Sequence, residues 1–226
     1  MDEYLKRIAD SLERAFPPDP DIYFFEKDSA FIWEPARNHF SQVSDISTVD
    51  ISLLKGMDEE IEKVRLNTRA FVEGNLANNV LIWGARGMGK STLIKSVVKA
   101  ASSQSNRLKV IEVSRDDIGQ VDKLLKLIKN INKKFIIFCD DISFDDNETS
   151  YKSLKSVLDG GLIGGLQNVL VYATSNRRHL LSRKTGDSEA FIRWEEEQDE
   201  RLSISDRFGI SIGFYECDQN LYLEIV

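Results

Sequence analysis

A glycine-rich turn between an apolar strand pattern and a helix pattern carries the clearest chemistry in this chain. Gly84, Gly89, Lys90 and Ser91 fill the fixed positions of the pattern G-x-x-x-x-G-K-[ST]. Such glycines let backbone N–H groups turn toward phosphate oxygens, and the following helix N-terminus adds partial positive charge. We expect Lys90 to reach the β- and γ-phosphates and the Ser91 hydroxyl to ligate Mg²⁺. The expected phosphate cradle comprises Gly84, Ala85, Arg86, Gly87, Met88, Gly89, Lys90, Ser91 and Thr92.

A pair of acids follows a second apolar run, at 135–139. Asp140 is placed to hold the Mg²⁺ shell, and Asp141 to polarise an attacking water. The alternative is that both acids cap the following segment, a common role for aspartate. Their position about 50 residues after the phosphate loop favours the catalytic interpretation.

Two further polar residues come next to apolar runs. Asn176 follows the run 169–173 and is placed to orient the water; a turn-forming asparagine is the alternative. Arg207 precedes the last apolar run and is placed to stabilise charge on a transferring phosphate. Its alternative is a surface ion pair with Asp206, which contributes little energy. The predicted catalytic set is Lys90, Asp141, Asn176 and Arg207, and the predicted metal ligands are Ser91 and Asp140.

Composition excludes several other classes of site. The net charge of −7 disfavours a generic nucleic-acid coat. Two cysteines and two histidines, without ligand spacing, argue against a disulfide framework and a zinc site. No stretch reaches the length of a membrane span, and no export signal opens the chain, so we expect a soluble cytoplasmic protein.

The elements that must position these residues alternate along the chain. Apolar runs predict strands at 79–83, 108–113, 134–139, 168–173 and 209–215, and helical patterns lie at 89–101, 116–130 and 149–158. This alternation predicts an α/β fold with a five-stranded parallel sheet flanked by helices. Ligands of such sheets bind at the carboxyl ends of the strands, where the candidate residues lie.

The N-terminal part has a different pattern. A helix is expected over 2–16, and Pro17, Pro18 and Pro20 end it. The aromatic stretch over 23–40 predicts an irregular arm packed on the main domain; a docking surface is the alternative. A charged helix is expected over 58–72, before the first strand.

With these motifs in place, the chain resembles the AAA+ P-loop ATPases, and within them a bacterial family described as a domain of unknown function. The resemblance extends over about residues 30–226. The segments that carry it are Phe31–Trp33, Leu53–Gly56, Asn78–Gly87, Phe138–Asp141, Tyr151–Gly161 and Ala173–Leu180.

The resemblance assigns roles to these positions. It implies that 84–91 is Walker A, that Asp140 and Asp141 are Walker B, and that Asn176 is sensor 1. Arg207 matches the arginine finger that acts across a subunit interface, and Leu53–Gly56 matches the strip that lines the adenine pocket. Walker B carries Asp-Asp here in place of the usual Asp-Glu.

The resemblance also implies a domain organisation. An N-terminal helix and aromatic arm are expected over 1–50, the nucleotide-binding core over 51–218, and the start of a truncated helical lid over 219–226.

The expected activity is hydrolysis of ATP to ADP and phosphate, with Mg²⁺, in a homo-oligomer in which Arg207 acts in trans to switch or remodel a partner protein. The main alternative is a nucleotide-gated adaptor with little turnover, favoured by the Asp at 141 and the missing lid. A small-molecule kinase fits less well, because the sequence offers neither a basic lid nor an acceptor pocket. A role on DNA draws no support from the acidic composition.

Overall fold

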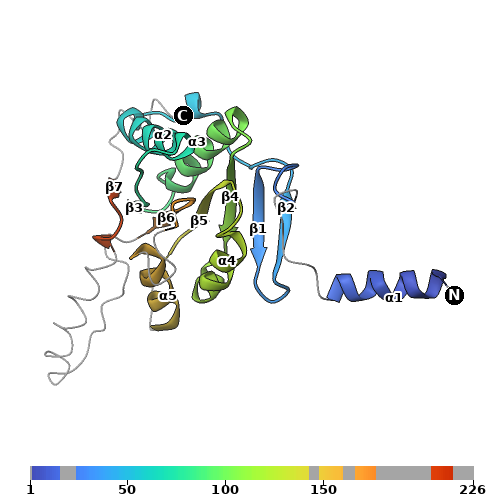
Figure 1. Cartoon of the computed structure of the whole chain (residues 1–226). Helices are drawn as coiled ribbons and strands as arrows, with labels where there is room; N and C mark the ends of the chain where they lie inside the picture. Colours follow the sequence, from blue (N-terminus) through green and yellow to red (C-terminus); the bar gives the residue numbers. More distant parts are fainter. Residues whose placement is uncertain (1, 16–23, 143–147, 160–165, 177–204, 216–226) are drawn as a thin grey trace, which may run out of the picture.

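The computed structural model describes residues 2–15, 24–142, 148–159, 166–176 and 205–215 (Figure 1). Within them lies a seven-stranded sheet of order β2-β1-β4-β5-β6-β3-β7. Its strands are β1 (Ala30–Glu34), β2 (His39–Val43), β3 (Val80–Gly84), β4 (Leu108–Val113), β5 (Lys134–Cys139), β6 (Val169–Ser175) and β7 (Ile210–Phe214).

Five of these strands are the parallel strands that the sequence predicts. β4, β5, β6, β3 and β7 pair in parallel with their neighbours. β6 lies between β5 and β3, with Cys139 opposite Ala173 on one side and Thr174 opposite Ile82 on the other. The carboxyl ends of these three strands therefore meet at one edge, as expected for a ligand site.

The expected irregular arm is instead a β-hairpin, so the sheet has seven strands rather than five. β1 pairs in parallel with β4 and antiparallel with β2. The turn between them is closed by hydrogen bonds from Arg37 N to Glu34 O (3.1 Å) and from Asn38 N to Pro35 O (3.3 Å). Asn38 adopts a φ of 49°, a left-handed conformation that asparagine tolerates.

The aromatic residues of the hairpin belong to the core, which excludes the alternative that they form an exposed docking surface. Phe25, Phe31, Trp33 and Phe40 are each at most 2% exposed. The Phe25 ring packs edge-on against Phe31, Phe40 and Phe135, with centroids 4.9, 5.5 and 5.1 Å apart. Edge-to-face contacts of this kind add to the apolar area that the rings remove from water.

Helices cover both faces of the sheet (Figure 1). α2 (Asp58–Glu73) and α3 (Lys90–Gln104) pack on one face, where Val64, Phe71 and Leu93 join a buried cluster. α4 (Val121–Ile128) and α5 (Glu148–Leu158) lie on the opposite face with the hairpin aromatics. Strand residues alternate between the two clusters, as the pleat of a strand requires.

One predicted helix is divided. The stretch 116–130 contains a 3-10 helix, η2 (Arg115–Gln120), followed by the α-helix α4. Ser114 caps η2 by accepting a hydrogen bond from Asp116 N, and Gly119 has a low intrinsic helix propensity. The short first turn therefore adopts the tighter 3-10 geometry.

The first helix, α1 (Asp2–Ala15), extends away from the sheet (Figure 1). Leu5, Ile8 and Leu12 share one face, as predicted, and each is more than half exposed. No helix in the described ranges is both long and apolar enough to cross a membrane. The predicted start of a lid over 219–226 lies outside the described residues.

Candidate nucleotide-binding site

The glycine-rich loop connects β3 to α3, and at two of its positions the structure explains why the residue is glycine. Gly89 caps α3 with a φ of 79°, in the left-handed region that favours glycine. At Gly84, a Cβ atom would lie 2.0 Å from the backbone oxygen of Phe214 in β7. The pattern G-x-x-x-x-G therefore lets the loop pass close to the neighbouring strand and then enter the helix.

Lys90, the first residue of α3, points back into this loop. Its side chain is 6% exposed, and its Nζ donates to Gly84 O (3.0 Å), Ala85 O (2.6 Å) and Asn176 Oδ1 (3.0 Å). Burial lowers the pKa of the Lys90 ammonium, while the carboxylates of Asp141 and Asp140 act in the opposite direction. The structure thus places a buried cation between the loop and the two acids.

Asp140, the first residue after β5, accepts hydrogen bonds from two hydroxyl groups. Ser91 Oγ of α3 donates to Asp140 Oδ1, and Thr174 Oγ1 of β6 donates to the same oxygen at 2.6 Å. The predicted metal ligands Ser91 and Asp140 are therefore brought together. Two oxygen donors of this kind suit Mg²⁺, which fills its remaining positions with water and phosphate oxygens.

Asp141 is held by the end of the same neighbouring strand. Its backbone N donates to Thr174 Oγ1 (2.8 Å), and its Oδ1 accepts a hydrogen bond from Asn176 Nδ2. Asp141 has a φ of 51°, a conformation that costs a non-glycine residue energy. The hydrogen bonds on both sides of Asp141 stabilise this backbone, which turns the carboxylate toward Asn176.

The structure therefore brings together five of the six predicted catalytic and metal residues: Lys90, Ser91, Asp140, Asp141 and Asn176. Arg207 precedes β7 and forms an ion pair with Asp159, which directly follows α5. Its predicted action across a subunit interface is left untested by a single chain.

The predicted adenine strip, Leu53–Gly56, leads directly to Met57, which lies beside the phosphate loop. The strip begins at the last residue of the 3-10 helix η1 (Ile51–Leu53). Leu54 and Met57 are half-buried and pack against the core cluster under α2 and α3. The Met57 Cε atom is 3.4 Å from the position that a Cβ on Gly89 would take. Leu53 is 65% exposed. An apolar wall thus borders the loop on this side.

Thr174 is the residue of this site that the sequence did not single out. It is 1% exposed and touches both acids through one hydroxyl. Its only signal is a position between the apolar run of β6 and Asn176. Threonine is common in strands because its branched side chain packs well there, so this signal does not separate a functional threonine from an ordinary one.

One known protein family matches most of this chain. A family model described as "Protein of unknown function (DUF815)" matches residues 26–226. The chain belongs to the DUF815 family. No curated protein matches it.

Several solved structures match the fold of this chain at low sequence identity. A chain of the E. coli MS115-1 HORMA:CdnC:Trip13 complex matches with a TM-score of 0.52 and 12% identity, over 77% of this chain and 68% of that one. The Aeropyrum pernix ORC1 protein, solved in complex with DNA, matches with a TM-score of 0.52 and 15% identity, over 75% and 48%. The Thermotoga maritima RuvB Holliday junction branch migration motor gives a TM-score of 0.47 and 19% identity, over 74% and 48%.

The first two likenesses confirm the AAA+ fold that the sequence predicts. At these identities they concern the fold alone. The chain spans about half the length of the ORC1 and RuvB chains that it matches.

Proposed function

We propose that this DUF815 protein binds ATP with Mg²⁺ and hydrolyses it to ADP and phosphate, and that the cycle switches a partner protein. The observation that carries the proposal is the hydrogen-bonded cluster of Lys90, Ser91, Asp140, Asp141 and Asn176 at the carboxyl edge of β3, β5 and β6. An anion-binding loop, a pair of oxygen ligands and an acid beside an amide are the parts that phosphoryl transfer to water needs.

Each residue has a distinct role in this proposal. Lys90 exchanges its bonds to Gly84 O and Ala85 O for phosphate oxygens, which bear more negative charge than backbone carbonyls. Ser91 and Asp140 hold Mg²⁺, which when bound neutralises charge on the phosphates. Asp141 accepts the proton of the attacking water, and Asn176 orients that water through its amide.

Arg207 is the residue through which hydrolysis would depend on oligomerisation. Inside one chain its guanidinium forms an ion pair with Asp159; the Arg207 side chain is 26% exposed and that of Asp159 is 40% exposed. An ion pair that is partly open to solvent contributes modest energy, so the more highly charged γ-phosphate of a neighbouring subunit can compete with Asp159 for Arg207. We propose that Arg207 leaves Asp159 at the subunit interface and stabilises the transferring phosphate there.

The decisive test is phosphate release with ATP·Mg²⁺ over a range of protein concentrations. We expect specific activity to rise with concentration and to vanish in Asp141→Asn and Arg207→Ala, both of which still bind ATP. Lys90→Ala should lose ATP binding itself. Unaltered ATP binding by Lys90→Ala would contradict the proposed site.

A nucleotide-gated adaptor is the second candidate, and the setting of Asp141 favours it. This carboxylate is one carbon shorter than the usual glutamate and is already bonded to Asn176. An acid in this arrangement has less reach toward a water. In the same experiment, tight ATP binding without turnover at any concentration, combined with different partner affinities for the ATP and ADP states, identifies the adaptor.

A further inference from the structure

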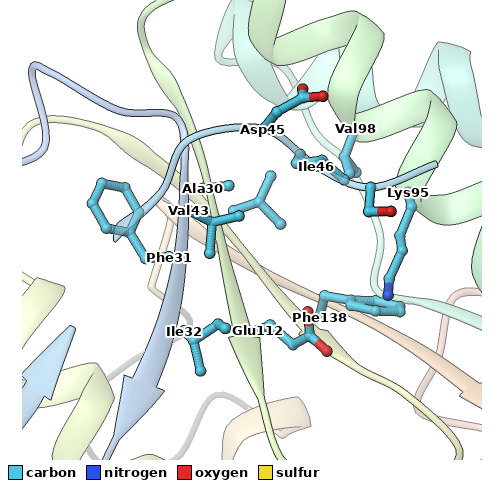
Figure 2. Close-up of a pocket in the computed structure, with 12 residues that line it drawn as sticks. Ala30, Phe31, Ile32, Val43, Asp45, Ile46, Lys95, Val98, Glu112 and Phe138 are labelled. Carbon is cyan, nitrogen blue, oxygen red and sulfur yellow. The ribbon is translucent and has the colours of Figure 1, made fainter. Parts of the chain in front are cut away.

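A cavity of about 150 Å³ lies on the α3 face of the sheet, beside the hairpin (Figure 2). Its walls come from β1, β2, β4, β5, α3 and the segment 45–47. Half of the twelve lining residues have small or branched apolar side chains: Ala30, Ile32, Val43, Ile46, Val98 and Val110. Apolar cavities of this size hold molecules of about six carbon atoms.

The wall of the cavity is held in place by hydrogen bonds and is therefore preformed. Lys99 Nζ of α3 donates to Asp45 Oδ2 (2.8 Å) and Ile46 O (2.9 Å). Ser96 Oγ, one turn earlier, donates to Val49 O (2.8 Å). These bonds fix the segment after β2 against the helix, so a ligand does not have to order it.

Two charged groups of opposite sign meet at one end of this cavity, next to the ring of Phe138 (Figure 2). Lys95 Nζ lies 5.4 Å from the centroid of that ring, and Glu112 is paired with Phe138 across β4 and β5. Both side chains are half-buried. Across the described part of the chain, the Lys95 ammonium contacts the Phe138 ring but has no hydrogen-bonding or ion-pair partner, and neither has the Glu112 carboxylate.

We propose that this cavity binds a small α-amino acid with an apolar side chain. The carboxylate of the ligand pairs with Lys95, its ammonium pairs with Glu112, and its side chain fills the apolar part of the hollow. A ligand with both charges satisfies both half-buried groups at once, whereas a ligand with one charge leaves the other group desolvated and unpaired.

The cavity adjoins the phosphate site along two elements. Lys95 lies one helical turn after Ser91 in α3, and Phe138 of β5 lies two residues before Asp140, which directly follows that strand. Residues four apart in a helix share a face. If the proposed function holds, an amino acid that fixes Lys95 and Phe138 therefore shifts the affinity for ATP·Mg²⁺, and ATP·Mg²⁺ shifts the affinity for the amino acid by the same factor.

Calorimetric titration of the full chain with L-leucine, 4-methylpentanoate and 3-methylbutylamine tests the site. The three probes share a similar apolar body and carry both charges, the carboxylate alone and the amine alone. We expect saturable one-site binding of L-leucine, and binding of each analogue weaker by about tenfold or more, as for the loss of one hydrogen-bonded charge.

Variants assign each charge to its partner. In Lys95→Met, which keeps an unbranched side chain over Phe138, L-leucine should bind no better than 3-methylbutylamine. In Glu112→Gln, it should bind no better than 4-methylpentanoate. Lys63→Met removes an exposed lysine of α2 and is the matched control, which should bind L-leucine as the unaltered chain does.

Three outcomes overturn the proposal: no saturable binding of L-leucine, unchanged binding in Lys95→Met and Glu112→Gln, or a cavity filled by a second copy. The last appears in sedimentation as an oligomer that Lys95→Met weakens. Lys90→Ala separates the two proposals, because it should lose ATP while retaining L-leucine. Binding of only one of the two ligands by the unaltered chain supports one proposal and refutes the other.

Discussion

At the scale of single residues, one buried hydroxyl is hydrogen-bonded to both candidate acids, Asp140 and Asp141. Thr174 Oγ1 donates to Asp140 Oδ1 (2.6 Å) and accepts from Asp141 N (2.8 Å). Thr174 O also accepts from Ile142 N (2.8 Å). The hydroxyl therefore fixes the carboxylate of one acid and the backbone of the next.

We expect Thr174→Val to lower kcat for ATP by about 10- to 100-fold, the range set by losing a hydrogen bond to a charged group. Valine keeps the shape of threonine but leaves Asp141 N without an acceptor. Affinity for ADP without Mg²⁺, measured by calorimetry, should change little, because Thr174 touches the acids rather than the phosphate loop.

Thr174→Ser is the control, because it keeps the hydroxyl and removes only a methyl group. It should recover most of the turnover of the unaltered chain. A Val variant as active as the Ser variant would show that the hydroxyl is dispensable, leaving Thr174 as a packing residue of β6.

The reactivity of the Cys139 thiol measures how well the end of β5, just before the two acids, is shielded from solvent. Burial raises the pKa of its thiol to about 12, and the carboxylates of Glu112 and Asp140 act in the same direction. The thiolate is the reactive form, so in a Cys217→Ser background native Cys139 should alkylate with iodoacetamide at pH 8 at least about a hundredfold more slowly than in denaturant. Comparable rates in the two states would mean that the strand end opens readily.

Much of the site could be predicted from residue types, because its residues occur at fixed spacings within short segments of the sequence. The phosphate loop occupies eight consecutive positions, and the acids directly follow an apolar strand. Thr174 escaped prediction because its role depends on β6 lying between β3 and β5, a relation that no local pattern contains.

At the scale of elements, the hairpin is what sequence reasoning missed. Its strands have five residues each, and the aromatic residues around them suggested an irregular arm. The useful signal was the alternation of Phe31 and Trp33 before a turn of Pro35 to Asn38, which is typical of a strand and its reversal. Pairing with β4, about 80 residues away in the sequence, stabilises this short strand and is not visible locally.

Phe31 and Ile32 provide a matched test of the hairpin, because they are neighbours on opposite faces of β1. Phe31 is 1% exposed and Ile32 is 42% exposed. We expect Phe31→Ala to lower the free energy of unfolding by about 3–5 kcal/mol, and Ile32→Ala by less than about 1.5 kcal/mol, since only the first leaves a buried cavity. Denaturant unfolding followed by tryptophan fluorescence measures both changes.

Equal losses from the two substitutions would contradict the burial of the aromatic face. A small loss from Phe31→Ala alone would mean that the hairpin contributes little to the stability of the sheet, and that the five central strands fold without it.

At the scale of the whole molecule, the order of the sheet explains why residues far apart in the sequence form one site. The strand that leads into the phosphate loop and the strand that leads into the acids are both neighbours of β6. Alternating strand and helix patterns predicted the parallel core because such connections place helices on both faces. The patterns did not reveal the hairpin strands β1 and β2, whose place in the sheet depends on the pairing of β1 with the distant β4.

Arg207 pairs with Asp159 within one chain. A mixing experiment tests whether Arg207 acts on the nucleotide of its own subunit or on that of a neighbour. Lys90→Ala keeps Arg207 but loses nucleotide, whereas Arg207→Ala keeps the nucleotide site. If Arg207 acts across an interface, an equal mixture of these two inactive variants should show about a quarter of the activity of the unaltered chain. The reason is that random assembly places an intact nucleotide site next to an intact arginine at about one interface in four. Phosphate release measures the recovery, and Lys90→Ala mixed with the double variant is the control, which should stay inactive. Activity absent from the first mixture, despite co-assembly in sedimentation, would place the action of Arg207 within its own chain.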